Sequence, residues 1–128
     1  RGFGLSPNFI ILTIMADFLF PLIPNAAADV RADAGAVSVE TYFTEVTTTT
    51  ASAITLANGL KVGQLKKIIF ITDAGDATLT PAKFVDGTNV TFADVGDYVV
   101  LMYTGDDSGW RAIESGNDAD GVNGPAIG

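Results

Sequence analysis

Short runs of β-branched and aromatic residues recur along this chain of 128 residues, with glycine, aspartate, asparagine or proline between them. The runs follow one another at intervals of about 8 to 12 residues, the spacing typical of β-sandwiches and barrels. Six segments share these properties and are predicted strands: 37–44, 66–72, 77–80, 89–92, 98–104 and 110–113. The pattern therefore predicts an all-β fold: an antiparallel β-sandwich, roll or small barrel with an extended apolar N-terminal arm.

Composition divides the chain into three parts. Residues 1–36 hold the arm and a linker rich in Ala, Asp and Gly, 37–115 form the predicted antiparallel β domain, and 116–128 are rich in Gly, Asn and Asp. We expect this last segment to be a flexible, exposed C-terminal tail. The length suffices for one domain with a single core, which leaves the arm as an appendage.

The arm carries two apolar runs separated by Asp17. A membrane-spanning helix needs about 20 consecutive apolar residues, and Asp17, Pro21 and Pro24 interrupt the arm before that length, so no span is predicted. Exposed apolar surface of this size is typical of a protein-binding segment. We therefore predict that its most apolar side chains bind a partner: Phe9, Ile10, Ile11, Leu12, Phe18, Leu19, Phe20, Leu22 and Ile23.

Two other interpretations of the arm stay open. In one, Phe18–Ile23 packs on the core of its own domain. In the other, the arm is a secretory signal, because Asn25–Asp29 resembles a cleavage site of small residues. The single positive charge before the apolar run and the acid and prolines within it argue against a signal. Met15-Ala16-Asp17 resembles a natural start, which would make residues 1–14 an upstream extension.

The ionisable residues exclude several kinds of chemistry. Seven Lys and Arg against fifteen Asp and Glu give a formal net charge of −8, the wrong sign for binding nucleic acid. Without His or Cys the chain cannot form a Ser-His-Asp triad, a thiol nucleophile, an iron–sulfur cluster or a His-ligated metal site. We therefore predict a non-enzymatic protein with no catalytic residue, no cofactor, no resident metal, and no nucleic-acid or membrane partner.

Most carboxylates lie in predicted turns beside glycine, where aspartate accepts backbone hydrogen bonds. Nothing in the spacing fixes a pair at the separation of about 5 to 9.5 Å that a glycosidase needs. Asp73 and Asp76 would form an irregular oxygen site for calcium with Asp106 and Asp107 only if their two loops faced each other. The turn interpretation is the stronger one.

A long stretch of the predicted β domain resembles a known family. The residues that carry the resemblance are five motifs in a fixed order: Gly59–Phe70, Asp76–Phe84, Gly87–Phe92, Val95–Tyr103 and Gly109–Ile113. Together they make Asn58–Glu114, 57 of 128 residues, similar to a small β domain of tailed-phage virion proteins, notably head-decoration and fibre proteins. The resemblance implies a non-enzymatic module, commonly a homotrimer, on the outside of a capsid or along a fibre.

The resemblance and the arm together predict a virion structural protein. We expect a bacteriophage capsid decoration or cement protein on the capsid surface, whose arm binds the major capsid protein or a neighbouring copy. The alternative is a fibre or surface adhesion module that binds host carbohydrate through exposed aspartates together with exposed Tyr98, Tyr103 and Trp110. Against that alternative, Trp110 opens a predicted strand and can equally anchor a small β core. An exported cellular protein is a third interpretation, which depends on the signal-like start.

Overall fold

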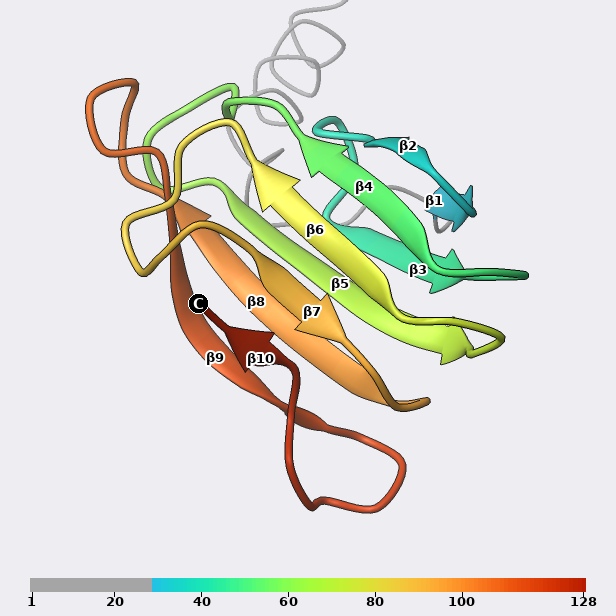
Figure 1. The fold of residues 1–128 in the computed structure, drawn as a ribbon. Coiled ribbons are helices and arrows are strands. Elements are labelled where there is room, and N and C mark those ends of the chain that lie inside the picture. The colour runs from blue at the N-terminus through green and yellow to red at the C-terminus, as the bar shows by residue number, and fades with distance from the viewer. Residues whose placement is uncertain (1–28) are drawn as a thin grey trace, which may run out of the picture.

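Two five-stranded sheets pack face to face in the computed structural model, which describes residues 29–128 (Figure 1). Sheet A contains, in spatial order, β1 (Asp29–Ala32), β3 (Phe43–Thr47), β5 (Leu65–Thr72), β8 (Asp97–Tyr103) and β9 (Trp110–Asn117). Sheet B contains β10 (Ala126–Ile127), β7 (Val90–Phe92), β6 (Ala77–Pro81), β4 (Ser52–Leu56) and β2 (Gly35–Val37). The predicted all-β sandwich is confirmed, and neither sheet closes into a barrel.

The first six strands form three stacked β-arches. In each arch one strand lies in sheet A and the next lies in sheet B: β1 with β2, β3 with β4, and β5 with β6. Neighbouring arches run in the same direction, so β1, β3 and β5 pair in parallel, as do β2, β4 and β6. The remaining strands extend both sheets by antiparallel pairing.

The mixed sheets correct the prediction of an antiparallel fold. The turn within each arch is short, 33–34, 48–51 or 73–76, and the first and third contain aspartate or glycine as hairpin turns do. A short turn of this kind can join two strands of one sheet or lead from one sheet to the facing one. The sequence shows where the chain reverses, and the packing of the sheets decides which strands then pair.

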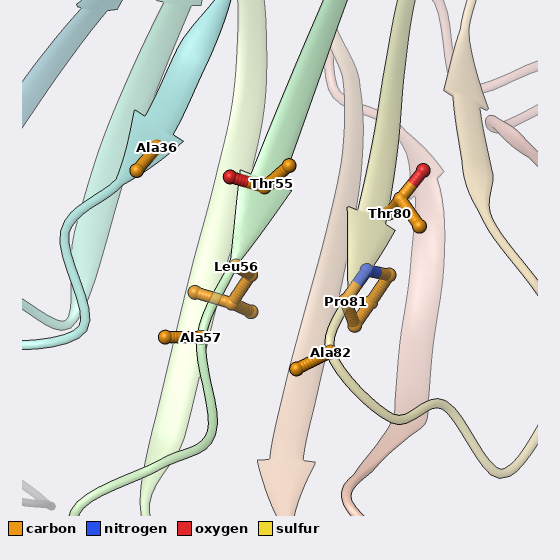
Figure 2. Close-up of a pocket in the computed structure, with 7 residues that line it drawn as sticks. All are labelled: Ala36, Thr55, Leu56, Ala57, Thr80, Pro81 and Ala82. Carbon is orange, nitrogen blue, oxygen red and sulfur yellow. The ribbon is translucent and has the colours of Figure 1, made fainter.

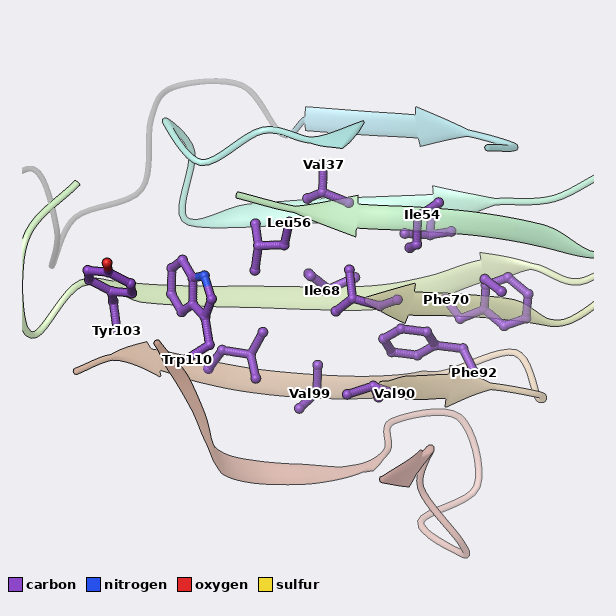
Figure 3. Packing of buried hydrophobic residues seen from close by; sticks show 14 residues of the cluster. Val37, Ile54, Leu56, Ile68, Phe70, Val90, Phe92, Val99, Tyr103 and Trp110 are labelled. Carbon is purple, nitrogen blue, oxygen red and sulfur yellow. The ribbon is translucent and has the colours of Figure 1, made fainter. Parts of the chain in front are cut away.

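Alternate residues of both sheets point into a single core (Figure 3). Parallel register places Val37, Leu56 and Pro81 side by side in sheet B, and all three are buried. Trp110 is fully buried, and its indole N–H donates a hydrogen bond of 2.8 Å to the Ala57 carbonyl. The cluster comprises Val37, Val46, Ile54, Leu56, Ile68, Phe70, Ala77, Leu79, Val90, Phe92, Val99, Leu101, Tyr103 and Trp110.

Hydrogen bonds between successive turns hold the arches in register. Asp33 has a φ of +56°, and its carboxylate accepts bonds from the Thr49 amide at 2.7 Å and hydroxyl at 3.0 Å. Those bonds, the amide first, hold the pKa of Asp33 below its usual value. In the next layer the Thr48 hydroxyl donates to the Gly75 carbonyl at 2.6 Å. Gly75 is needed there, because a Cβ at this position would lie 2.3 Å from the Ala51 nitrogen.

The strands extend beyond the segment expected to be the β domain. β1 and most of β2 lie within residues 1–36, which composition assigns to the arm and linker, while 38–42 form a loop rather than a strand. The end of β9 and all of β10 lie within the expected tail, where Gly128 bonds to the backbone of Asn89. Both segments are poor in β-formers and are held by strands beside them rather than by their own propensity.

Neighbouring positions on β4 test the assignment of the two faces. Ile54 is fully buried, whereas Thr55 is exposed on the outer face of sheet B. Ile54→Ala removes buried methyl groups and leaves a cavity, so we expect it to lower the free energy of unfolding by about 2 to 5 kcal/mol. Thr55→Ala, the matched control, should change it by less than about 0.5 kcal/mol. Denaturant unfolding measures both, and equal effects would contradict the register.

Candidate partner-binding surfaces

The nine arm residues predicted to bind a partner, Phe9, Ile10, Ile11, Leu12, Phe18, Leu19, Phe20, Leu22 and Ile23, lie outside the described residues. The structure does show where the arm joins the fold. Asp29 begins β1, the edge strand of sheet A, and its carboxylate accepts hydrogen bonds from the Ser38 amide at 3.3 Å and the Thr44 hydroxyl at 3.0 Å. The arm therefore leaves the domain from a fixed point.

A buried lysine connects this point to the interior. The Lys66 side chain is fully buried, and its ammonium donates to the Thr41 carbonyl at 2.9 Å, the Thr41 hydroxyl at 2.9 Å and the Thr44 hydroxyl at 2.5 Å. The Thr44 hydroxyl in turn donates to Asp29. Burial lowers the pKa of Lys66 to about 8, although the nearby Asp29 charge opposes that shift. The sequence gives no sign of this network, because nothing in it distinguishes the buried Lys66 from the adjacent Lys67 on the outer face.

The two ends of the sandwich differ in charge. We call the end with the arch turns the turn end, and the end where β1 begins the arm end. The arm end carries Lys61 and Lys83 together with the exposed side chains of Leu60 and Val62, of which 55% and 74% are accessible. It also carries five acidic residues: Asp29, Glu40, Asp86, Asp106 and Asp107. Besides the buried Asp97, six aspartates lie at the turn end: Asp33, Asp73, Asp76, Asp94, Asp118 and Asp120. The molecule therefore has one strongly acidic end and one end of mixed charge.

The loops suggested for calcium do not face each other. Asp73 and Asp76 follow β5 at the turn end, whereas Asp106 and Asp107 follow the antiparallel β8 at the arm end. Asp106 instead accepts a short hydrogen bond from the Tyr103 hydroxyl, and this bond raises the pKa of Tyr103 to about 12. Within residues 29–128 no three acidic side chains gather closely enough to hold a metal ion.

The aromatic residues considered for carbohydrate binding do not form an exposed platform. Trp110 is fully buried and Tyr103 is 2% accessible, and their rings contact each other at a centroid distance of 5.2 Å. Tyr98 lies on the outer face of sheet A, where its hydroxyl donates to Glu114 at 2.8 Å and the Lys67 ammonium lies 4.5 Å from its ring. The expectation that all three are exposed together is wrong.

The outer face of sheet A is unexpectedly apolar. On β5 the inward Ile68 and Phe70 are fully buried, yet the outward positions also carry Ile69 and Ile71. Strands that are apolar on both sides are typical of sheets covered on both sides. The large apolar side chains of this face are Phe43, Leu65, Ile69, Ile71, Tyr98, Val100 and Met102. The continuous apolar run Ile68–Ile71 was the signal for this face, and the sequence analysis used it only to predict a strand at 66–72.

Sheet B has a different outer face. A shallow groove of about 450 Å³ lies where β2, β4 and β6 end (Figure 2). Its lining is small or apolar, without a charged side chain: Ala36, Thr55, Leu56, Ala57, Thr80, Pro81 and Ala82. The groove offers no acid, base or nucleophile other than two threonine hydroxyls. It is therefore not a site for chemistry.

No protein-family model and no curated protein matches this chain. The resemblance of Asn58–Glu114 to phage virion domains thus stays a prediction. In the part of the chain that the structure describes, no helix has the length and hydropathy to cross a membrane.

The pH dependence of stability tests the buried lysine. Lys66 has a pKa of about 8 in the folded protein against 10.5 for an ordinary lysine, so between these values the unfolded chain binds more protons. The free energy of unfolding should therefore rise with pH above about 8, by at most about 3 kcal/mol. Lys66→Met should remove this rise, as measured by urea unfolding at a series of pH values.

Tyr103 supplies the internal control for that experiment. Its pKa is raised from 10.0 to about 12, so above pH 10 the folded protein retains a proton that the unfolded chain loses. Stability should therefore fall again above pH 10. The hydrogen bond to Glu114 raises the pKa of Tyr98 as well, so Tyr103→Phe should reduce this fall rather than abolish it, and should leave the rise from pH 8 unchanged. A rise from pH 8 that survives in Lys66→Met would refute the assignment to Lys66.

Proposed function

We propose that this chain is a virion structural protein that binds the outside of an assembled phage capsid as a decoration or cement protein. It acts without chemistry, and its partners are the major capsid protein and neighbouring copies of itself, in a homotrimer. One observation carries the proposal: an apolar arm leaves a rigid β-sandwich from a point that is hydrogen-bonded into the core through Asp29, Thr44 and Lys66. The resemblance of Asn58–Glu114 to virion domains supports the same class.

A cement protein stabilises a shell by binding the assembled form more tightly than its separated subunits. For that purpose a tether must not pull free of the domain that it holds. At the arm end, the first residue of β1 is bonded to the loop after β2 and to β3, and β3 is bonded to the buried Lys66. A force that pulls on the arm is thereby shared by the loop after β2, by β3 and by β5.

The charge distribution favours one orientation on a shell. If the arm end faces the capsid, the six aspartates of the turn end point away from it. A negative outer surface limits adhesion to nucleic acid and to other virions with the same coat. The partly apolar loop with Leu60 and Val62 then lies on the side of the shell, where its exposed side chains can be covered.

The adhesion alternative receives less support. Carbohydrate binding by stacking needs aromatic faces open to solvent. Trp110 and Tyr103 belong to the core, and Tyr98 is engaged with Glu114 and Lys67. The decoration proposal needs no such platform and is the one retained.

Capsids stripped of this protein provide the test. Adding back the full chain should restore their resistance to heat, whereas a chain that lacks residues 1–24 but retains every described strand should bind weakly and restore little. Val122→Asp in the full chain alters an exposed apolar residue at the turn end and should protect as well as the unaltered chain. Sedimentation with capsids and a thermal melt of the shell measure both effects. Equal protection with and without residues 1–24 would refute the role of the arm.

A further inference from the structure

The outer face of sheet A is an apolar surface that the described residues leave partly uncovered. On strands β5 and β8 it carries Leu65, Ile69, Tyr98 and Met102, each only partly buried. Burying apolar area is favourable by about 25 cal/mol per Å², so leaving such a face in water is costly for a soluble domain. Its strands have the composition of a sheet that is covered on both sides.

The dimensions of this face decide what can cover it. Five strands at about 4.8 Å make it about 24 Å wide, and its outward residues on β5, Leu65 to Ile71, span about 20 Å. The footprint is thus about 480 Å², against the about 800 Å² per partner that a stable interface between two folded domains buries. A second sandwich laid flat on this face would gain too little contact. An extended segment needs much less area.

The chain itself contains a segment of matching length and chemistry. Phe18–Ile23 are six consecutive apolar residues, which span about 20 Å when extended. The first described residue, Asp29, begins the edge strand of sheet A, so the arm starts beside such a face. An apolar strip of this length can contact Leu65 and Met102, which are paired on the central strands.

Charge fixes the direction in which this segment would lie. Asp17 immediately precedes Phe18. Of the two cations on the outer face of sheet A, Lys67 is paired with Asp118 at 3.3 Å, whereas Arg111 on β9 is exposed and has no ion pair within residues 29–128. Asp17 beside Arg111 places the segment across the sheet, with Phe18 towards β9 and Ile23 towards β1.

We propose that the outer face of sheet A binds Phe18–Ile23 from a neighbouring copy of the chain, so that each arm links two copies. The choice of a neighbouring copy rests on the proposed function, because an arm folded onto its own sheet would hold nothing together. Closed exchange of an arm around a ring is a common route to a symmetric oligomer. Phe9–Leu12 and the arm end then stay free for the capsid protein.

The absence of cysteine from the chain allows a direct test. One preparation carries Leu19→Cys and a second carries Met102→Cys, both in the full chain, and the two are mixed and mildly oxidised. Met102 pairs with Arg111 on β9, and Leu65 on β5 pairs with Met102, so these positions lie in one row across the sheet. A disulfide forms only where two Cα atoms come within about 7 Å, so we expect a product with twice the mass of one chain. Phe20→Cys with Leu65→Cys is a second pair in case one variant fails to fold. The matched control replaces Met102→Cys by Thr55→Cys on the outer face of sheet B.

Binding of the arm raises the local thiol concentration into the millimolar range, so cross-linking at low protein concentration should exceed the Thr55→Cys control on the order of tenfold. Arg111→Glu should reduce it. Equal cross-linking with the control would overturn the inference, and so would a disulfide that forms only within one chain of the Leu19→Cys, Met102→Cys double variant. If the chain protects capsids from heat but its copies do not cross-link, the inference is refuted and the proposed function stands. If the copies cross-link but do not protect capsids, the proposed function is refuted.

Discussion

Parallel stacking of the three β-arches is the constraint on which the rest of the structure depends. Ile54 lies beside Leu79 and Leu56 beside Pro81, so each arch places its inward side chains next to those of the following one. A shift by one residue would turn these side chains to the outer face. Two sets of hydrogen bonds outside the core oppose such a shift: Asp33 accepts from Thr49, and Thr48 donates to Gly75 in the next turn. Core and turns thus specify the same register.

The first arch ends the stack in a way that keeps it from growing. Where the following arches place Val46 and Phe70, β1 places Arg31. Its guanidinium donates to the Ala32 carbonyl at 3.2 Å, and Gly35 leaves room for it, since a Cβ there would lie 3.0 Å from Nη1. A charged inner position and strands of four and three residues are features that discourage further strand pairing at an edge. This edge of the stack is therefore unsuited to pairing with a strand of another chain.

The sequence predicted what depends on local pattern and missed what depends on packing partners. The strands at 66–72, 98–104 and 110–113 were found because β-branched and aromatic residues are dense there, and Trp110 was recognised as a possible anchor. The parallel pairing was missed, because alternation shows which face a residue occupies but not which strand lies beside it. Lys66 gave no signal, since its burial depends on Thr41 and Thr44 from another arch.

An apolar outer face and an acidic end act together on how copies can meet. The apolar face of sheet A favours association, and without direction it would favour aggregation as well. The six aspartates at the turn end repel a second copy approaching end to end, and this repulsion acts over about 8 Å at physiological ionic strength. Two copies that lie side by side in the same orientation can keep their turn ends separated by more than this range of about 8 Å. If copies associate as proposed, this repulsion favours contact through the faces, where the six apolar residues Phe18–Ile23 match the area available.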